Sequence, residues 1–228
     1  MEKEKKNFFS AKNITILAVL VALVVVLQVC GGYFVIGTTS LSFVLIPIVL
    51  GGILLGVWAG ALLGFLFGFI VLMYGVSGTD AFTATLLAQQ PALTVLTVLL
   101  KGILAGIVPA LLYKVIAKKQ KYIAVFVAAA SAPLVNTGVF VLGALCMSGL
   151  FTEFATANGV SLTYFIFIGC AGINFIIEFA LNLVLSPAIY TVINVVEKQM
   201  LKKHTVKVVA GNGEDLKEDV ATNNDNLS

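Results

Sequence analysis

Long apolar stretches dominate this sequence and constrain its fold more than any other feature. Of the 228 residues, 60% are hydrophobic and only 11% are charged, whereas a soluble domain averages about 25% charged residues. A helix that crosses the hydrocarbon core of a bilayer needs roughly 20 apolar residues, so the roughly 180 residues of the apolar region accommodate about six such helices. The sequence therefore predicts an all-α membrane protein.

Six apolar segments are expected to be transmembrane helices. Their approximate bounds are 14–33, 43–57, 59–75, 93–116, 122–148 and 164–194. Residues 41–75 are almost continuously apolar. A single helix over them would be about 52 Å long at about 1.5 Å per residue, too long for a hydrocarbon core of about 30 Å. We therefore expect a tight hairpin near residues 56–60, with Trp58 at the membrane interface.

Every basic residue is a lysine, and most of the lysines flank the apolar segments. Three clusters stand out: Lys3/Lys5/Lys6/Lys12, Lys114/Lys118/Lys119/Lys121 and Lys198/Lys202/Lys203/Lys207. Cytoplasmic loops of membrane proteins carry an excess of Lys and Arg. Six spans with a cytoplasmic N-terminus put all three clusters inside, whereas five spans would put the second cluster and the C-terminus outside. We predict six spans with both termini cytoplasmic, and no nucleic-acid partner.

Composition divides the chain into three segments. Residues 1–12 form a Lys-rich cytoplasmic segment, 13–197 the six-helix transmembrane domain, and 198–228 a polar cytoplasmic tail. The tail is acidic and Asn-rich near its end, a composition typical of disorder. The start resembles a signal peptide, but no A-x-A cleavage site follows. We therefore interpret the first apolar segment as a transmembrane helix.

Polar residues inside the apolar spans are the strongest indication of a binding site. Lys101 lies about 12 Å along its span from the outer end, Asn174 lies at a similar depth, and Asn136 lies in the outer half of another span. Glu178 and Asn182 follow Asn174 at intervals of four residues, so the three share one helix face. Charged side chains at such depth normally face the bundle interior or a polar cavity.

Two interpretations of these residues remain open. Lys101, Asn136, Asn174 and Glu178 line a ligand pocket, or Lys101 and Glu178 form a structural ion pair that ties two helices together. One cation, one anion and two amides suit a ligand that combines a carboxylate with hydrogen-bonding groups. Gln28, near the outer end of the first span, is a weaker candidate.

Small residues recur at a spacing of four, which allows helices to approach closely in lipid. The glycine series consists of Gly52, Gly56, Gly60, Gly64 and Gly68. We expect it to serve packing inside the bundle, although the hairpin prevents it from forming one continuous face. Ala18 and Ala22 repeat the spacing in the first span and are predicted to form a docking face for a partner helix.

Motifs of common enzyme chemistry are missing from the sequence. It has no G-x-x-x-x-G-K-[ST] phosphate loop, and its one histidine, His204, lies in the tail. Cys30, Cys146 and Cys170 have no paired spacing and are interpreted as small buried hydrophobic residues. We expect no metal or cofactor and no catalytic residues.

Several motifs, in their order along the chain, resemble the substrate-binding (S) components of energy-coupling-factor (ECF) vitamin transporters. Residues 10–23 resemble the first helix of that family. In the run 42–64, Ile46-Pro47 precedes glycines at a spacing of four, which is similar to a pattern of the family. Lys101-Gly102-Ile103-Leu104-Ala105-Gly106 resembles its fourth helix, and Asn136-Thr137-Gly138-Val139-Phe140 its fifth. The resemblance covers about residues 10–195.

The resemblance implies a specific function in the bacterial cell membrane. S components bind a vitamin or similar micronutrient from outside and dock on a transmembrane coupling subunit that carries two ATPase subunits. The whole S component is thought to topple in the membrane to release its ligand inside. The docking face of the family's first helix falls on Ala18 and Ala22, and the outer loop, here about 31–42, closes over the ligand.

The resemblance leaves the riboflavin, pantothenate and folate classes of ligand open. In riboflavin-type members, Asn residues occupy places comparable to Asn136 and Asn174. Two other functions stay open as alternatives: an accessory membrane subunit without a ligand, and a small multispan enzyme that uses Lys101 and Glu178 as acid and base.

Overall fold

The computed structural model describes residues 11–31, 35–36, 39–40 and 43–225, with side chains described for 11–31 and 43–198. The described part is helical except for one short antiparallel pairing, between β1 (Val35–Ile36) and β2 (Thr39–Ser40). Most of the predicted cytoplasmic segment 1–12, and most of the outer loop 31–42, lie outside the described residues. The remaining chain confirms the helical class that hydropathy predicts.

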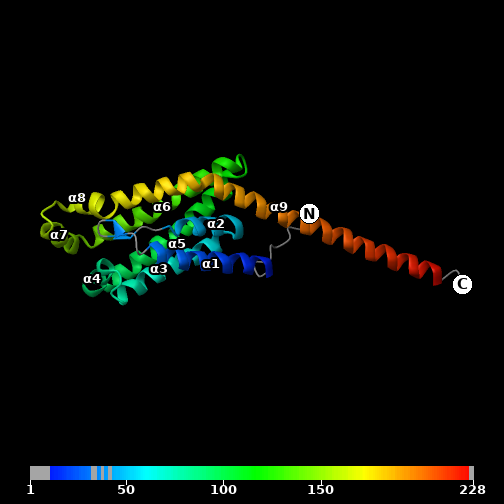
Figure 1. Cartoon of the computed structure of the whole chain (residues 1–228), viewed down its shortest axis with the longest axis horizontal. Helices are drawn as coiled ribbons and strands as arrows, with labels where there is room; N and C mark the ends of the chain where they lie inside the picture. Colours follow the sequence, from blue (N-terminus) through cyan, green and yellow to red (C-terminus); the bar gives the residue numbers. More distant parts are fainter. Residues whose placement is uncertain (1–10, 32–34, 37–38, 41–42, 226–228) are drawn as a thin grey trace. The chain divides into compact units, whose positions relative to one another are not determined.

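The helices agree closely with the expected spans (Figure 1). In chain order they are α1 (Ala11–Gly31), α2 (Leu45–Leu55), α3 (Val57–Val76), α4 (Ala81–Gln89), α5 (Pro91–Ile116), α6 (Lys121–Cys146), α7 (Ser148–Ala157), α8 (Leu162–Tyr164), the π-helix η1 (Phe165–Cys170) and α9 (Gly172–Asp225). Five segments in the described part are long and apolar enough to cross a membrane. α2 is a shorter apolar helix of 11 residues, about 16 Å long.

A glycine turn divides the long apolar stretch at the place that the sequence predicts. Gly56 links α2 to α3 with φ 100°, a conformation that costs glycine little because it has no Cβ. Trp58, the second residue of α3, is 83% exposed. The two helices fold back on each other, and a Cβ placed on Gly60 would lie 3.1 Å from the Cα of Gly52.

The α3 and α5 helices meet along a glycine seam, which we define as Gly60, Gly64 and Gly68 of α3 with Gly102 and Gly106 of α5. A Cβ on Gly64 would collide with the backbone of Gly102, and one on Gly106 with the backbone of Gly60. A Cβ on Gly68 would lie 2.8 Å from the carbonyl oxygen of Val98. Gly52, Gly60, Gly64 and Gly68 therefore serve packing inside the bundle, as expected. The expectation is wrong for Gly56, which forms the turn and has nothing within 4 Å of an added Cβ.

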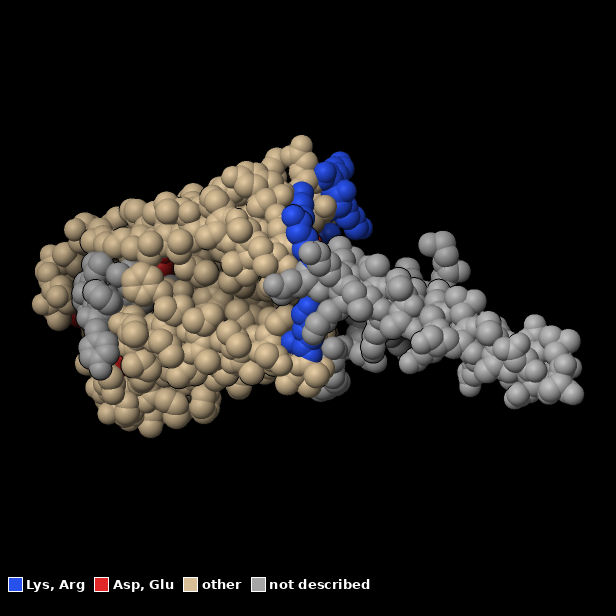
Figure 2. All heavy atoms as spheres, turned by 45° about the vertical axis from the view of Figure 1, so that its right-hand side comes forward, with Lys and Arg blue, Asp and Glu red and all other residues tan. Residues whose placement is uncertain are grey.

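Charged residues are segregated along the bundle. Lys12 lies at the start of α1, and Lys118, Lys119 and Lys121 lie around the turn between α5 and α6. Figure 2 shows lysine side chains gathered at one end of the bundle and acidic side chains toward the other. This placement agrees with the expectation that the lysine clusters lie on one side of the membrane.

Helix α9 belongs to two compact units of the chain. The first unit ends at Ile189 and the second begins at Tyr190. The second unit is described as a helix that continues to Asp225, where the sequence predicts a disordered tail from residue 198. Disorder of this tail in solution stays a prediction. All features of the site described below lie in the first unit.

Candidate functional site

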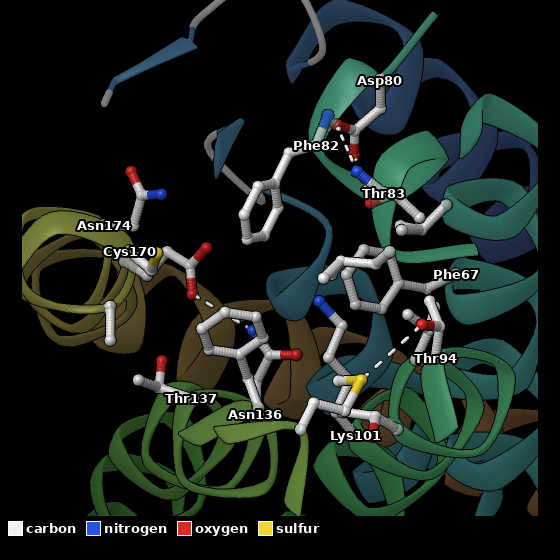
Figure 3. Close-up of a pocket in the computed structure, with 18 of the residues that line it drawn as sticks. Phe67, Asp80, Phe82, Thr83, Thr94, Lys101, Asn136, Thr137, Cys170 and Asn174 are labelled. Atoms are coloured by element: carbon white, nitrogen blue, oxygen red, sulfur yellow. Dashed lines mark hydrogen bonds between the residues drawn. The ribbon is translucent and has the colours of Figure 1, made fainter. Parts of the chain in front are cut away.

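A cavity of about 80 Å³ lies inside the first unit, lined by residues of α1, α3, α4, α5, α6, η1 and α9. One ordered water needs roughly 10–15 Å³ of such space, so the cavity has room for several waters or for part of a small ligand. Figure 3 shows side chains from opposite sides of the bundle pointing toward this space. The cavity is therefore bounded by side chains from most of the helices of this unit.

All four residues predicted to bind substrate line this one cavity. Lys101 comes from α5, Asn136 from α6, and Asn174 and Glu178 from α9. Gln28 of α1, the weaker candidate, lines it as well. Helices far apart in the sequence thus bring the intramembrane polar residues together, as their depth along the spans predicts. Their role toward a ligand stays a prediction.

The ammonium group of Lys101 is held by aromatic rings. Its Nζ lies 5.7 Å from the ring centroid of Phe67 on α3 and 5.8 Å from that of Phe140 on α6, within the range of cation–π attraction. The carboxylates of Glu178 and Asp80 also act electrostatically on Lys101. Because Gly102 packs in the glycine seam, the backbone that carries Lys101 is held against α3.

Glu178 is tied to both neighbouring polar residues. Nδ2 of Asn136 donates to Oε2 of Glu178 at 3.5 Å, which links α6 to α9. One turn further along α9, Nδ2 of Asn182 donates to the backbone oxygen of Glu178 at 2.8 Å. Asn182 is buried but does not line the cavity. The shared helix face predicted for α9 is therefore a buried polar column that meets the cavity at Asn174 and Glu178.

Several buried amide oxygens have no hydrogen-bond partner in the described part of the chain. They are Oε1 of Gln28 and Oδ1 of Asn136, Asn174 and Asn182. An unsatisfied buried polar group costs about 1–3 kcal/mol. Three of the four residues line the cavity, so the site has hydrogen-bonding capacity that the protein itself does not use.

A family comparison places this site in a functional context. The family described as "ECF transporter, substrate-specific component" matches residues 12–190, which include every spanning helix of the first unit and the whole cavity. The chain belongs to this family. No curated protein matches it. The S component is thus a multispan membrane transport protein, from a family of transporter subunits rather than of enzymes.

The cavity of the S component contains residues that the sequence did not single out. Asp80 begins α4 as its N-cap, accepting hydrogen bonds from the backbone nitrogens of Phe82 at 3.1 Å and Thr83 at 3.2 Å. Its other oxygen accepts from Oγ1 of Thr83 at 2.6 Å. Asp before a short helix is a recognisable capping signal, and it could have placed α4 within the loop 76–92. No sequence signal distinguished Phe67, Phe82 and Phe140 from the other phenylalanines.

Aromatic side chains of the S component pack together beside the cavity. Phe82 of α4 lies edge-on to Phe151 of α7, with ring centroids 6.0 Å apart, and 6.1 Å from Phe154. Phe151 also packs edge-on against Phe140, which lines the cavity. Helices α4 and α7 therefore meet in an apolar layer at one wall of the site.

The two alanines predicted to form a docking face are exposed on α1 of the S component. Ala18 and Ala22 are both exposed, whereas the buried side of α1 consists of Leu20, Val24, Gln28 and Gly31. They take no part in the core of the described bundle. Cys170 is buried as expected, but Cys30 and Cys146 are exposed, because they lie on outward faces of spanning helices. The prediction that all three cysteines are buried is therefore wrong for these two.

Proposed function

We propose that this S component binds a small, water-soluble, vitamin-like micronutrient from outside a bacterial cell. It delivers the ligand inward together with a transmembrane coupling subunit and two ATPase subunits. The ligand site comprises Lys101, Asn136, Asn174 and Glu178. The observation that carries the proposal is that these four polar residues, from three helices of a member of this family, line one cavity.

The proposed topology has six spans, with α2 as the short second span, and both termini in the cytoplasm. Residues 13–197 then form the membrane domain, with cytoplasmic segments at 1–12 and 198–228. The gathering of lysines at one end of the bundle supports this arrangement (Figure 2), since lysines favour the cytoplasmic side. If Lys12 and Lys119 lie on the same side, the chain crosses the membrane an even number of times between them. The long spans α1, α3 and α5 give three crossings, so α2 must be the fourth.

Single-cysteine labelling in intact cells tests the topology. In a chain whose native cysteines are replaced, an impermeant maleimide should label Cys introduced at Thr79 and not Cys introduced at Lys119. Labelling of position 119 from outside would show that an odd number of spans precedes it, which contradicts the six-span topology.

We further propose that Ala18 and Ala22 dock on the coupling subunit. Their exposure on α1 and their spacing support a flat patch that permits close helix approach. Replacing both by Leu should abolish uptake in cells that carry the coupling subunit and the two ATPase subunits. It should leave ligand affinity nearly unchanged.

The matched control for this experiment is the double change Ala180→Leu with Ala188→Leu, which alters two exposed alanines of α9. It should leave uptake intact. Equal loss of binding and uptake in the α1 variant would assign Ala18 and Ala22 to the stability of the subunit. Failure of the wild-type chain to support uptake of any compound would favour an accessory subunit without a ligand.

A further inference from the structure

The chemistry of the cavity wall restricts the class of ligand, provided that the proposed function holds. Three side chains that line it, each more than nine-tenths buried, carry an amide oxygen without a partner in the described part of the chain: Gln28 (3% exposed), Asn136 (6%) and Asn174 (8%). They come from α1, α6 and α9. Buried acceptors without a partner therefore belong to lining residues on three different helices.

The amide of Asn136 is oriented by its neighbour. A carboxylate only accepts hydrogen bonds, so the Asn136 side chain turns its nitrogen toward Oε2 of Glu178, at 3.5 Å. Its Oδ1 is thereby left as the acceptor that has no partner. In Figure 3 the Asn136 amide lies between Lys101 and the carboxylate that its dashed bond reaches. The bond to the carboxylate thus determines which atom of the Asn136 amide is left without a partner.

The charges of the lining favour the same kind of ligand. Its charged residues are Asp80, Lys101 and Glu178, so acidic groups outnumber basic ones. The only ammonium group among them already lies over the rings of Phe67 and Phe140. A ligand carboxylate would have to enter a site that holds two carboxylates, and like charges in a low-dielectric interior repel strongly.

Aromatic side chains supply part of the apolar wall. Phe67, Phe82 and Phe140 line the cavity from α3, α4 and α6, and flat rings pack well against such faces. We propose that the ligand is a neutral or cationic compound with a flat, nitrogen-containing ring whose N–H groups donate to Gln28, Asn136, Asn174 and Glu178. A ligand anchored by a carboxylate, which the residue types alone suggested, is disfavoured.

Matched pairs of small probes test this class on the full chain purified in detergent. The first pair is nicotinamide and nicotinate, and the second is 2-aminopyrimidine and pyrimidine-2-carboxylate. Within each pair the ring is kept while an N–H donor replaces a carboxylate. Calorimetric titration and thermal shift should show the N–H member binding at least tenfold more tightly.

Two cavity variants show whether the preference arises at the proposed atoms. Glu178→Gln should reduce the tenfold preference to less than threefold, and Asn174→Leu should weaken the N–H probes with Glu178 still present. The matched control Glu153→Gln removes the same charge from an exposed position on α7 and should keep the full preference. Unchanged preference in both cavity variants would overturn the assignment.

Other outcomes separate this inference from the proposed function. Equal or tighter binding of the carboxylate probes, or binding of no probe, overturns the ligand class. Native mass spectrometry of the freshly purified protein then shows whether the proposed transport function fails as well. A bound carboxylate compound would refute only the class, whereas a chain that carries no compound and forms no complex with a coupling subunit would refute the transport function as well.

Discussion

Helix α5, within the first unit, has a tightly packed side and a side that lines the cavity. On one side, Gly102 and Gly106 form the glycine seam with α3, where the backbones leave no space for a Cβ. On the other side, Thr94, Thr97 and Lys101 line the cavity, where buried polar atoms lack partners. Adjacent residues thus differ in environment: Lys101 lines the polar cavity, and Gly102 lies in the glycine seam.

The contrast indicates how this fold supports a polar cavity within an apolar bundle. There is little hydrophobic drive between helices in lipid, so close packing of small residues supplies much of the association. The seam provides such packing between α3 and α5 and needs no polar groups. The cavity then carries unsatisfied oxygens, each of which costs stability. We expect the seam to govern folding and the cavity to govern binding.

The largest effect is expected in the seam. Gly64→Leu should leave little folded protein, because the new side chain would meet the backbone of Gly102. Overpacking typically costs about 1–3 kcal/mol and occasionally more, and we expect a loss above this range because the obstacle is backbone. The measurement is thermal unfolding in detergent. Gly138→Leu is the control, since a Cβ at Gly138 meets nothing within 4 Å. If the Gly64 variant unfolds at the temperature of the wild-type protein, the glycine seam does not govern folding.

A smaller loss of stability is expected where the two surfaces meet. Lys101→Met removes the positive charge that shares the cavity with Glu178 and Asp80. The expected cost is below that of a broken buried salt bridge, which is about 3–5 kcal/mol. Adding Glu178→Gln should recover most of it, as judged by the unfolding temperature. A double variant no more stable than the single one would mean that Lys101 is not balanced by Glu178.

Ligand affinity should respond to the cavity while folding does not. Asn174→Leu should weaken binding about 10–100-fold, or about 1.4–2.8 kcal/mol. It should leave the free energy of unfolding within about 1 kcal/mol, because it removes an oxygen that has no partner. The control is Asn158→Leu at an exposed position, expected to bind normally. If Asn174→Leu lowers stability and affinity together, the cavity governs folding as well as binding, contrary to our expectation.

The smallest effect is expected at Asn182, buried beneath the cavity. Its Oδ1 lacks a partner while its Nδ2 bonds the backbone oxygen of Glu178. Asn182→Leu should therefore change the free energy of unfolding by less than about 1 kcal/mol, since the loss and the gain nearly cancel. Chemical denaturation in mixed micelles would measure it. A loss above about 2 kcal/mol would show that the polar column stabilises the fold.

The sequence by itself determined the membrane class, the approximate spans, the break near Gly56 and the polar residues inside the spans. These features depend on local composition and on depth along a helix, and both can be counted along the chain. The depths of Lys101, Asn136 and Asn174 also predicted that they would meet, because spans of similar length align in a bilayer.

The tertiary structure alone decided which side chains surround those residues. Apart from the polar face of α9, the spans are apolar around most of their circumference, so no amphipathic stripe indicates how the other helices are rotated. For that reason the partners of the glycine series, the two rings beside Lys101 and the approach of α4 to the cavity were not predictable. The orientation of the Asn136 amide depends on Glu178, 42 residues away, and such a contact exists only once the helices have packed.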